Sequence, residues 1–337
     1  MNPLKNILIA FFIFSISSTQ AQQSMIGVFE SSNDVGNPQN QGQTTYRSED
    51  QSYLLSGSGT NMWGTKDELH LTYKEIQGDF ILRARVSFIG EGVDPHRKIG
   101  WSIRSTLQGD DQHVSAEVHG DGLTSLQFRK SPGGITEQLV STDSFPDVVQ
   151  LERKGSTYIM STAKFGKEFT TVTLPDFKLP NQVFVGIFIC SHNAEVIEKA
   201  IFSNVRIIKP APADLVQYRD YLSSNLEIMD IKTGKRKIVK QYHGSLQAPN
   251  WTTNGKTLIF NQEGALYNFD IQSQQSNLLY TGFANRNTND HVLTFDGATI
   301  GISHHSESDD GQSIIYYLPT TGGDPIRVTP LGPSYFH

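Results

Sequence analysis

Residues 79–88 read DFILRARVSF and alternate apolar with polar side chains. The apolar members of this run are Phe80, Leu82, Ala84, Val86 and Phe88. Successive side chains of a β-strand point to opposite faces, so the alternation predicts a strand with one buried and one exposed face. Beyond a turn-rich segment, residues 99–104 read IGWSIR and repeat the pattern, with Trp101 on the inward side. The two stretches predict an antiparallel sheet with a cationic outer face.

The composition favours an all-β protein of about two domains. The chain has 337 residues, of which 37% are hydrophobic, with 29 Gly and 14 Pro. At roughly 100 to 200 residues per domain, this length allows about two domains and a sizeable core. Short apolar runs separated by Gly, Asn and Asp are typical of β-rich folds.

The first 21 residues have the pattern of a secretory signal peptide. Lys5 gives a basic start, residues 7–16 are largely apolar, and small residues precede a cleavage site after Ala21. This pattern predicts an exported protein, periplasmic or extracellular. No later segment approaches the ~20 apolar residues that a membrane span needs, so none is predicted.

The charge and the single cysteine narrow the function further. The formal net charge is -6 and becomes -7 when the leader with Lys5 is removed, which argues against nucleic acid as a partner. Cys190 is the only cysteine, so no intrachain disulfide is possible, and it lies in an apolar run. We expect a buried, unreactive thiol there.

Further alternating segments extend the first domain to residue 209. They are residues 113–119, 126–129, 148–153, 158–163, 183–190 and 200–208. With the strands preceding residue 79, they make about a dozen strands. That number is typical of a jelly-roll β-sandwich, predicted here over residues 22–209.

This half of the chain resembles the concanavalin A-like lectin and glucanase superfamily. The resemblance is carried by residues 62–63, 78–80, 99–104, 113–119, 151–153 and 202–205. It implies a β-sandwich domain of the kind often attached to carbohydrate-active proteins. The glucanases of the superfamily carry alternating catalytic carboxylates on one strand. Glu117 and Asp121 come nearest to that pattern, but their spacing does not reproduce it, so hydrolysis by this domain is not expected.

Residues 210–216 are predicted to be a Pro/Ala linker, and the sequence repeats itself beyond it. Hairpins that begin at Leu226, Leu266 and Ile315 align at offsets of 40 and 49. Between them, strands meet at the turns Asn254-Gly255 and Asp296-Gly297. A period of this length predicts propeller blades, here two to three over residues 217–337.

The repeats resemble those of TolB-type propellers, whose blades carry a Pro-Asp-Gly-Lys-like turn, seen at residues 253–256 and 295–298. Closed propellers have about four to eight blades. We therefore expect the chain to be a truncated form of a longer protein; self-association that closes the ring is the alternative.

The first candidate site is the outer face of the predicted sandwich sheet, if its strands pair in sequence order. Its residues are Arg83, Arg85, Arg104, His113, Glu117, His119, Gln127 and Arg129. Arginine recognises carboxylates through a planar fork, so an acidic sugar such as a uronate would suit this face. Trp63 would stack on a sugar ring from a neighbouring loop. The alternative is a solvated face with charge pairs between strands.

The second candidate site is a divalent metal in the propeller. His291 precedes the turn at Asp296 by five residues, and His337 falls at the same position of the next repeat. Repeated inward histidines could bind a metal. The resemblance extends to oligogalacturonate lyases, which use a metal held by propeller histidines. The alternative is a structural or solvated role for both.

Three functions remain open on the sequence, and whether the protein is an enzyme is left undecided. The leading hypothesis is an exported protein whose sandwich binds carbohydrate or cell-envelope glycan without catalysis, with the propeller as an interaction platform. The second is a metal-assisted lyase or hydrolase of acidic polysaccharide, with His291 as a ligand. The third is an envelope component that docks other envelope proteins.

Overall fold

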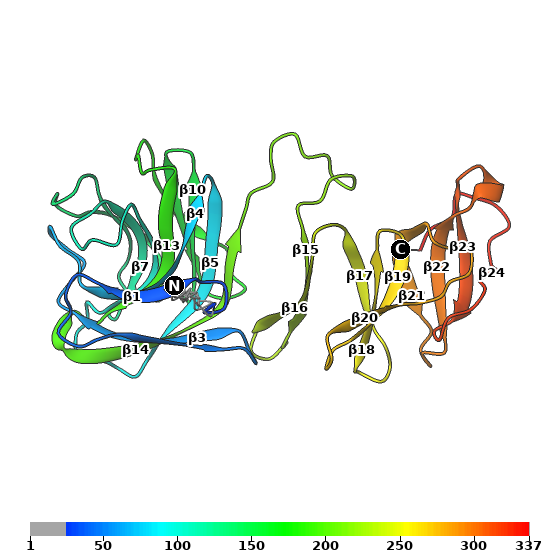
Figure 1. Ribbon diagram of the computed structural model, residues 1–337, viewed down its shortest axis with the longest axis horizontal. Coiled ribbons are helices and arrows are strands. Elements are labelled where there is room, and N and C mark those ends of the chain that lie inside the picture. Colours follow the sequence, from blue (N-terminus) through cyan, green and yellow to red (C-terminus); the bar gives the residue numbers. More distant parts are fainter. Residues whose placement is uncertain (1–24, 337) are drawn as a thin grey trace, which may run out of the picture.

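The computed structural model describes residues 25–336 and is all-β (Figure 1). Two seven-stranded antiparallel sheets form a sandwich, followed by a two-stranded hairpin and two four-stranded sheets. Within the described residues, the regular structure outside the strands is the short 3₁₀ helix η1 (Glu307–Asp309). The predicted leader lies outside the described residues. The same part of the chain contains no helix with the length and apolarity to cross a membrane.

The first sheet of the sandwich is ordered β1 (Ser31–Val35), β4 (Leu69–Gln77), β13 (Gln182–Cys190), β6 (Lys98–Arg104), β7 (His113–His119), β8 (Thr124–Arg129) and β9 (Glu137–Val140). The second is ordered β12 (Thr170–Leu174), β11 (Thr157–Ala163), β10 (Val148–Lys154), β5 (Phe80–Ile89), β14 (Asn193–Ile208), β3 (Ser52–Gly59) and β2 (Gln43–Arg47). All pairs in both sheets are antiparallel. The predicted jelly-roll-type sandwich is confirmed.

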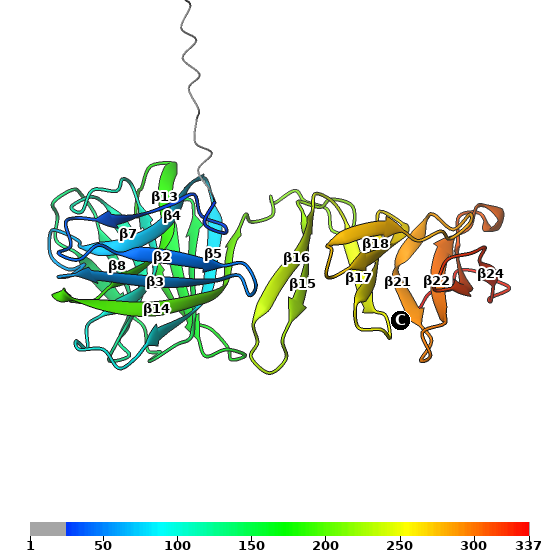
Figure 2. The ribbon, with the colours of Figure 1, turned by 60° about the horizontal axis from the view of Figure 1, so that its bottom comes forward.

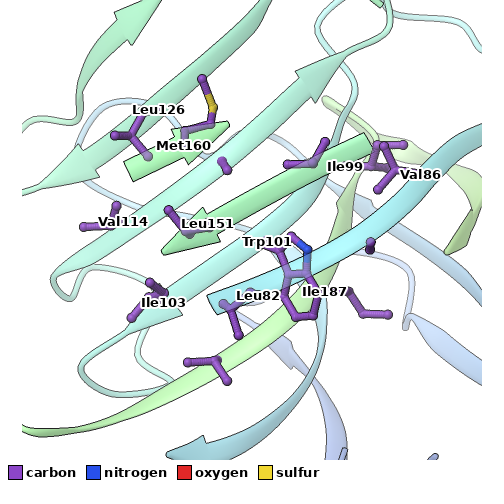
Figure 3. Packing of buried hydrophobic residues seen from close by; sticks show 14 of the residues in the cluster. Leu82, Val86, Ile99, Trp101, Ile103, Val114, Leu126, Leu151, Met160 and Ile187 are labelled. Carbon is purple, nitrogen blue, oxygen red and sulfur yellow. The ribbon is translucent and has the colours of Figure 1, made fainter. Parts of the chain in front are cut away.

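The core lies between these two sheets and is made by the alternating residues of each strand (Figure 3). Trp101 is fully buried, as predicted, with Ile187 and Ala116 beside it on the neighbouring strands. Leu82 and Leu151 pair across the second sheet and face the same core. The period-two pattern of the sequence therefore identified the inward faces correctly.

The prediction that the strands of residues 79–88 and 99–104 share one sheet is wrong. β5 pairs with β10 and β14, whereas β6 pairs with β13 and β7 in the opposite sheet. Residues 90–97 cross from one layer to the other. Both strands still point their apolar residues to one core, because each layer of a sandwich faces the other.

The second face of the first sheet is also buried. All residues of β6, β7 and β8 are buried, including the polar ones. Chain segments at 61–67, 105–112 and 131–136 contact this face through hydrogen bonds to its side chains. The face that the sequence predicted to be solvated is thus a polar interior.

The C-terminal half begins with the hairpin β15 (Ser224–Met229) and β16 (Arg236–Tyr242). Two sheets follow, each with its strands in chain order: β17 (Leu246–Trp251), β18 (Thr257–Gln262), β19 (Ala265–Asp270) and β20 (Gln275–Leu278), then β21 (Asn287–Leu293), β22 (Thr299–His305), β23 (Ser313–Pro319) and β24 (Ile326–Arg327). These are the predicted blades. Gly255 and Gly297 have φ of 65° and 71° in the predicted turns, a conformation that favours glycine.

The hairpin and the two sheets pack in a row beyond the sandwich (Figure 2). Leu226 and Val239 of the hairpin share a cluster with Phe260 and Phe269 of the next sheet. A second cluster joins the two four-stranded sheets. The domain boundaries stay a prediction; β14 ends at Ile208 and β15 begins at Ser224.

Polar contacts dock the hairpin onto the sandwich. The side chain of Gln51 donates to the carbonyl of Ile238 and accepts from its amide, both at 2.9 Å. Asn204 makes the same pair of contacts, donating to the carbonyl of Gly234 and accepting from the amide of Arg236. Side-chain amides therefore replace a strand partner for this part of the hairpin.

Candidate functional site

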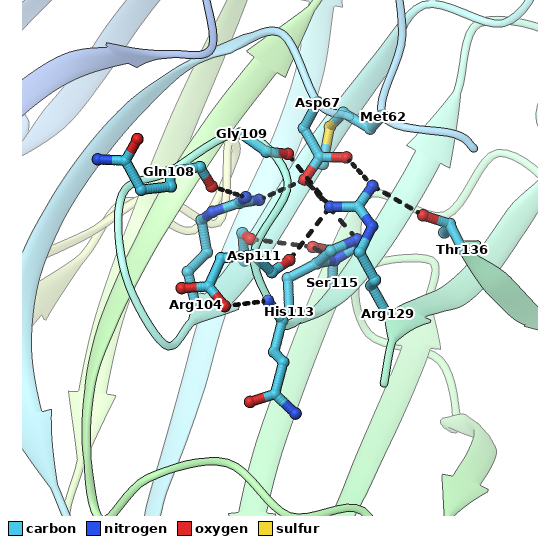
Figure 4. Close-up of polar contacts among 12 residues, drawn as sticks. Met62, Asp67, Arg104, Gln108, Gly109, Asp111, His113, Ser115, Arg129 and Thr136 are labelled. Carbon is cyan, nitrogen blue, oxygen red and sulfur yellow. Dashed lines mark hydrogen bonds and ion pairs between the residues drawn. The ribbon is translucent and has the colours of Figure 1, made fainter. Parts of the chain in front are cut away.

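A buried ion-pair network occupies one end of the polar face of the first sheet (Figure 4). Asp67 accepts from Arg104 Nη1 at 2.8 Å and from Arg129 Nη2 at 2.6 Å, and all three side chains are fully buried. Arg129 also donates to the carbonyls of Gly134 and Gly109, at 3.0 and 3.2 Å. The two guanidinium forks predicted to bind an acidic sugar are thus engaged inside the protein.

Burial and neighbouring charges determine which side chains of this network are ionised. Burial by itself raises the pKa of Asp67, yet the surrounding cations outweigh it and hold that pKa below its ordinary value. His113 lies 3.8 Å from the carboxylate, but burial lowers the pKa of His113 to about 3. His113 is therefore neutral near pH 7, and Arg104 and Arg129 are the cations that keep Asp67 ionised. We assign the network a structural role, because it fixes three loop segments over the sheet.

Arg83 and Arg85 do not join this face, because β5 belongs to the second sheet. Arg83 donates to Gln150 Oε1 at 2.8 and 2.6 Å. Arg85 donates to the carbonyl of Thr233 at 2.6 Å and stacks on Phe165 at 4.3 Å. Both line a cavity of about 450 Å³ between the sandwich and the hairpin. The predicted single cationic patch is therefore two separate groups on opposite layers.

A second cavity, of about 240 Å³, opens at the other end of the polar face of the first sheet. We call it the His119 cavity. It is lined by Asn61, Trp63, His96, Lys98, His119, Leu123, Gln127, Gln138 and His192. Two of the predicted site residues, Trp63 and His119, meet here with Gln127. Trp63 is 43% exposed, so part of its indole is accessible at the edge of the cavity.

Lys98 fixes one wall of the cavity. Its Nζ donates to Asn61 Oδ1 at 2.9 Å and to the carbonyl of His96 at 3.2 Å, and lies 3.4 Å from His192 Nδ1. Burial, together with the Lys98 cation, lowers the pKa of His192. The three donors of the ammonium are thereby matched to protein acceptors. The remaining groups on the wall are mainly neutral donors and acceptors.

Glu117 lies under the cavity without lining it. Neither carboxylate oxygen has a hydrogen-bond partner among the described residues, and burial raises the pKa of Glu117. Its closest basic neighbour is His119, whose Nε2 lies 3.7 Å from Glu117 Oε2. The Nδ1 of His119 is also buried without a hydrogen-bond partner in this part of the chain. Buried polar atoms without a partner are uncommon in folded proteins, and here they also occur in the Asp67 network, at Arg104 Nε and His113 Nε2.

The predicted propeller site is described only in part. His291 is buried, its Nε2 lies 3.3 Å from the carbonyl of Ile259, and burial lowers its pKa. His304 accepts from the amide of Arg286 at 3.2 Å. His337 lies outside the described residues. Metal binding by His291 and His337 stays a prediction.

The sequence did not identify Asn61, His96, Lys98 or His192 as site residues. Lys98 begins the alternating strand over residues 98–104 and lies on its outward side, whereas Asn61, His96 and His192 lie in irregular segments without a periodic signal. Only the fold brings the four residues to one cavity. Asp67 was also missed, since a lone carboxylate in a polar loop gives no local signal.

Comparison with known proteins finds similarity over parts of the chain. No family model matches it. An uncharacterised protein of Agrobacterium fabrum is 42% identical over 117 residues, which are 34% of this chain and 39% of that protein. The chain thus spans about two fifths of the length of that relative.

Two solved structures are similar over part of the chain. A protein of Agrobacterium tumefaciens described as a candidate TolB is 41% identical, with a TM-score of 0.32 over 34% of this chain and 41% of that one. A carbohydrate-binding module from Bacillus subtilis is 11% identical, with a TM-score of 0.38 over 55% of this chain and all of that one.

Proposed function

We propose that this is an exported, non-catalytic carbohydrate-binding protein that takes a sugar unit of a cell-envelope or extracellular glycan into the His119 cavity. The observation that carries the proposal is the exposed indole of Trp63 at the rim of a cavity walled by amide and imidazole groups. An aromatic platform beside converging neutral polar groups suits a sugar ring, which has an apolar face and a border of hydroxyl groups.

The volume and chemistry of the cavity set the kind of ligand. At about 240 Å³ it lies just below the ~300–1,000 Å³ usual for drug-sized ligands, so it suits a single sugar ring. Asn61, Gln127 and Gln138 offer both donors and acceptors to hydroxyl groups. Because Asp67 already engages Arg104 and Arg129, hydroxyl groups rather than sugar carboxylates are the proposed contacts.

The rest of the chain has a supporting role in this proposal. The leader predicted over residues 1–21 directs export, and the blade sheets present the sandwich to the envelope or to another envelope protein. Partial identity to a protein described as a candidate TolB is compatible with that role.

Binding of the full chain to a panel of neutral and acidic oligosaccharides tests the proposal. We expect binding by the wild type, weakened about ten-fold or more, or about 1.4 kcal/mol, by Trp63→Ala, since aromatic anchors dominate binding energies. Trp251→Ala is the matched control, because Trp251 is 50% exposed on a blade sheet. A folded wild type that binds no member of the panel, or equal loss in both variants, contradicts the proposal.

A further inference from the structure

Three side chains with metal-binding groups meet at the rim of the His119 cavity. They are His96, before β6, His119, at the end of β7, and Asp121, in the turn that follows. One ligand atom from each lies within 4.8 Å of the other two. His96 Nδ1 and Asp121 Oδ2 are 3.9 Å apart. Among the described residues, this is the one group of three His, Cys, Asp or Glu side chains whose ligand atoms lie close enough to hold a metal ion.

His119 supplies an independent sign of a ligand. Its side chain is 4% exposed, and its Nδ1 has no hydrogen-bond partner among the described residues. Its other ring nitrogen, Nε2, lies 3.5 Å from Gln127 Nε2 and 3.7 Å from Glu117 Oε2. A histidine that binds a metal through one nitrogen commonly turns the other to a carboxylate, which fixes the ring and its tautomer. In His119 the carboxylate lies near Nε2 at more than hydrogen-bond distance, and Nδ1 is the ring nitrogen without a partner among the described residues.

Backbone hydrogen bonds hold the two loops of the group together. The amide of Asp121 donates to the carbonyl of Pro95 at 2.9 Å, and the amide of Gly120 donates to the carbonyl of Arg97 at 2.9 Å. Asp121 Oδ1 accepts from the amide of Leu123 at 3.0 Å, which leaves Oδ2 directed to His96. The loops are therefore positioned before any ligand arrives.

The loop before β6 is fixed in turn by a buried ion pair. Arg97 Nη1 donates to Glu198 Oε2 at 2.7 Å, and both side chains are about 5% exposed. Gly120 packs directly on Arg97, because a Cβ at that position would lie 2.8 Å from Arg97 Cγ. Movement of His96 relative to Asp121 would break this packing.

We infer that His96, His119 and Asp121 bind one divalent transition-metal ion of the zinc type at the rim of the His119 cavity, next to the amide groups proposed above as sugar contacts. Two imidazole nitrogens and one carboxylate oxygen match the ligands of such ions, and three protein ligands leave a position open. With metal–ligand bonds of about 2.0–2.2 Å, tetrahedral ligand atoms lie about 3.4 Å apart. The side chains therefore need to close by no more than about 1.4 Å.

Nearby charges are compatible with an ion at this position. Asp121 supplies a negative charge and Glu117 stands behind His119. Lys98 is the opposing cation, but its Nζ is held by Asn61 Oδ1 at 2.9 Å. The ring of His192 also packs against that of His96, with the two centroids 5.4 Å apart.

Isothermal titration of the metal-free full chain with Zn²⁺ tests the inference, with the visible absorption of bound Co²⁺ as a second readout. We expect one ion per chain, and at least about ten-fold weaker binding in His96→Ala and in Asp121→Asn. Both substitutions alter exposed side chains, so the fold is retained, and circular dichroism checks this. His243→Ala is the matched control, since His243 is exposed on the loop after β16.

Two results would overturn the metal site: no Zn²⁺ uptake by the folded wild type, or equal uptake by wild type, His96→Ala and Asp121→Asn. The titration contains no sugar, and the oligosaccharide panel is run with a chelator as well as with Zn²⁺. Failure of the sugar proposal and failure of the metal site are therefore separate outcomes.

Discussion

Removal of the Asp67 carboxylate tests the interpretation of the buried arginines most directly. Asp67 is the anionic partner of Arg104 and Arg129, and all three side chains are fully buried. Breaking a buried ion pair by removing one partner costs about 3–5 kcal/mol, because a buried charge is left uncompensated. Asp67→Ala leaves two such charges, so we expect the sandwich to lose at least that much of its free energy of unfolding.

Urea unfolding of the full chain measures this loss. The measurement is made in a Trp251→Phe background, so that the fluorescence reports the tryptophans of the sandwich, of which Trp101 lies in the core. Asp67→Asn is a milder variant that keeps one acceptor oxygen and removes the charge, and its loss should be smaller than that of Asp67→Ala.

An exposed ion pair on the same sheet is the control. Lys130 and Glu137 lie 2.8 Å apart with both side chains at least half exposed. Exposed pairs contribute about 0–1 kcal/mol, so Glu137→Gln should change the free energy of unfolding by no more than that. If Asp67→Ala behaved like Glu137→Gln, the two guanidinium groups would be solvated and our interpretation of this face would be refuted.

Two further predictions concern acid stability and the docked hairpin. The pKa of His113 is about 3 in the folded protein and about 6.5 in the unfolded chain. Between these two pH values the unfolded state binds more protons than the folded state. The free energy of unfolding therefore falls as the pH is lowered, by up to about 1.4 kcal/mol per pH unit. His113→Gln should flatten this slope in urea unfolding at pH 4 to 7, and an unchanged slope would contradict burial of a neutral His113. Gln51→Ala removes both hydrogen bonds to Ile238 and should speed amide exchange in β16 by the equivalent of about 1–2 kcal/mol. Gln241→Ala, which alters an exposed side chain of β16 itself, should leave the exchange unchanged. Equal exchange in both variants would exclude Gln51 as the docking residue.

Much of the fold could be predicted from local patterns. The strands over residues 79–88 and 99–104, the inward position of Trp101 and the glycine turns of the blades follow from periodicity and backbone preference. These properties depend on neighbours a few residues apart, which the sequence displays directly.

The candidate site could be predicted only in part. Trp63 and His119 were chosen from the sequence and do line one cavity, whereas Arg83 and Arg85 lie on the other layer. Alternation assigns each side chain to a face, but it does not specify which strand lies beside which. That choice depends on the free energy of the whole packed sandwich.

The sequence by itself determined the all-β class, the strand faces, the blade repeats and the apolar core. Only the tertiary structure decided that the polar face of the first sheet is an interior, because Asp67 comes from a loop distant in sequence and neutralises two arginines there. The tertiary structure also brings His96 beside His119 and Asp121, which are already neighbours in sequence. The alternation of side chains along a strand determines which face of the sheet each one points to. Burial and charge pairing depend instead on segments that meet only when the chain has folded.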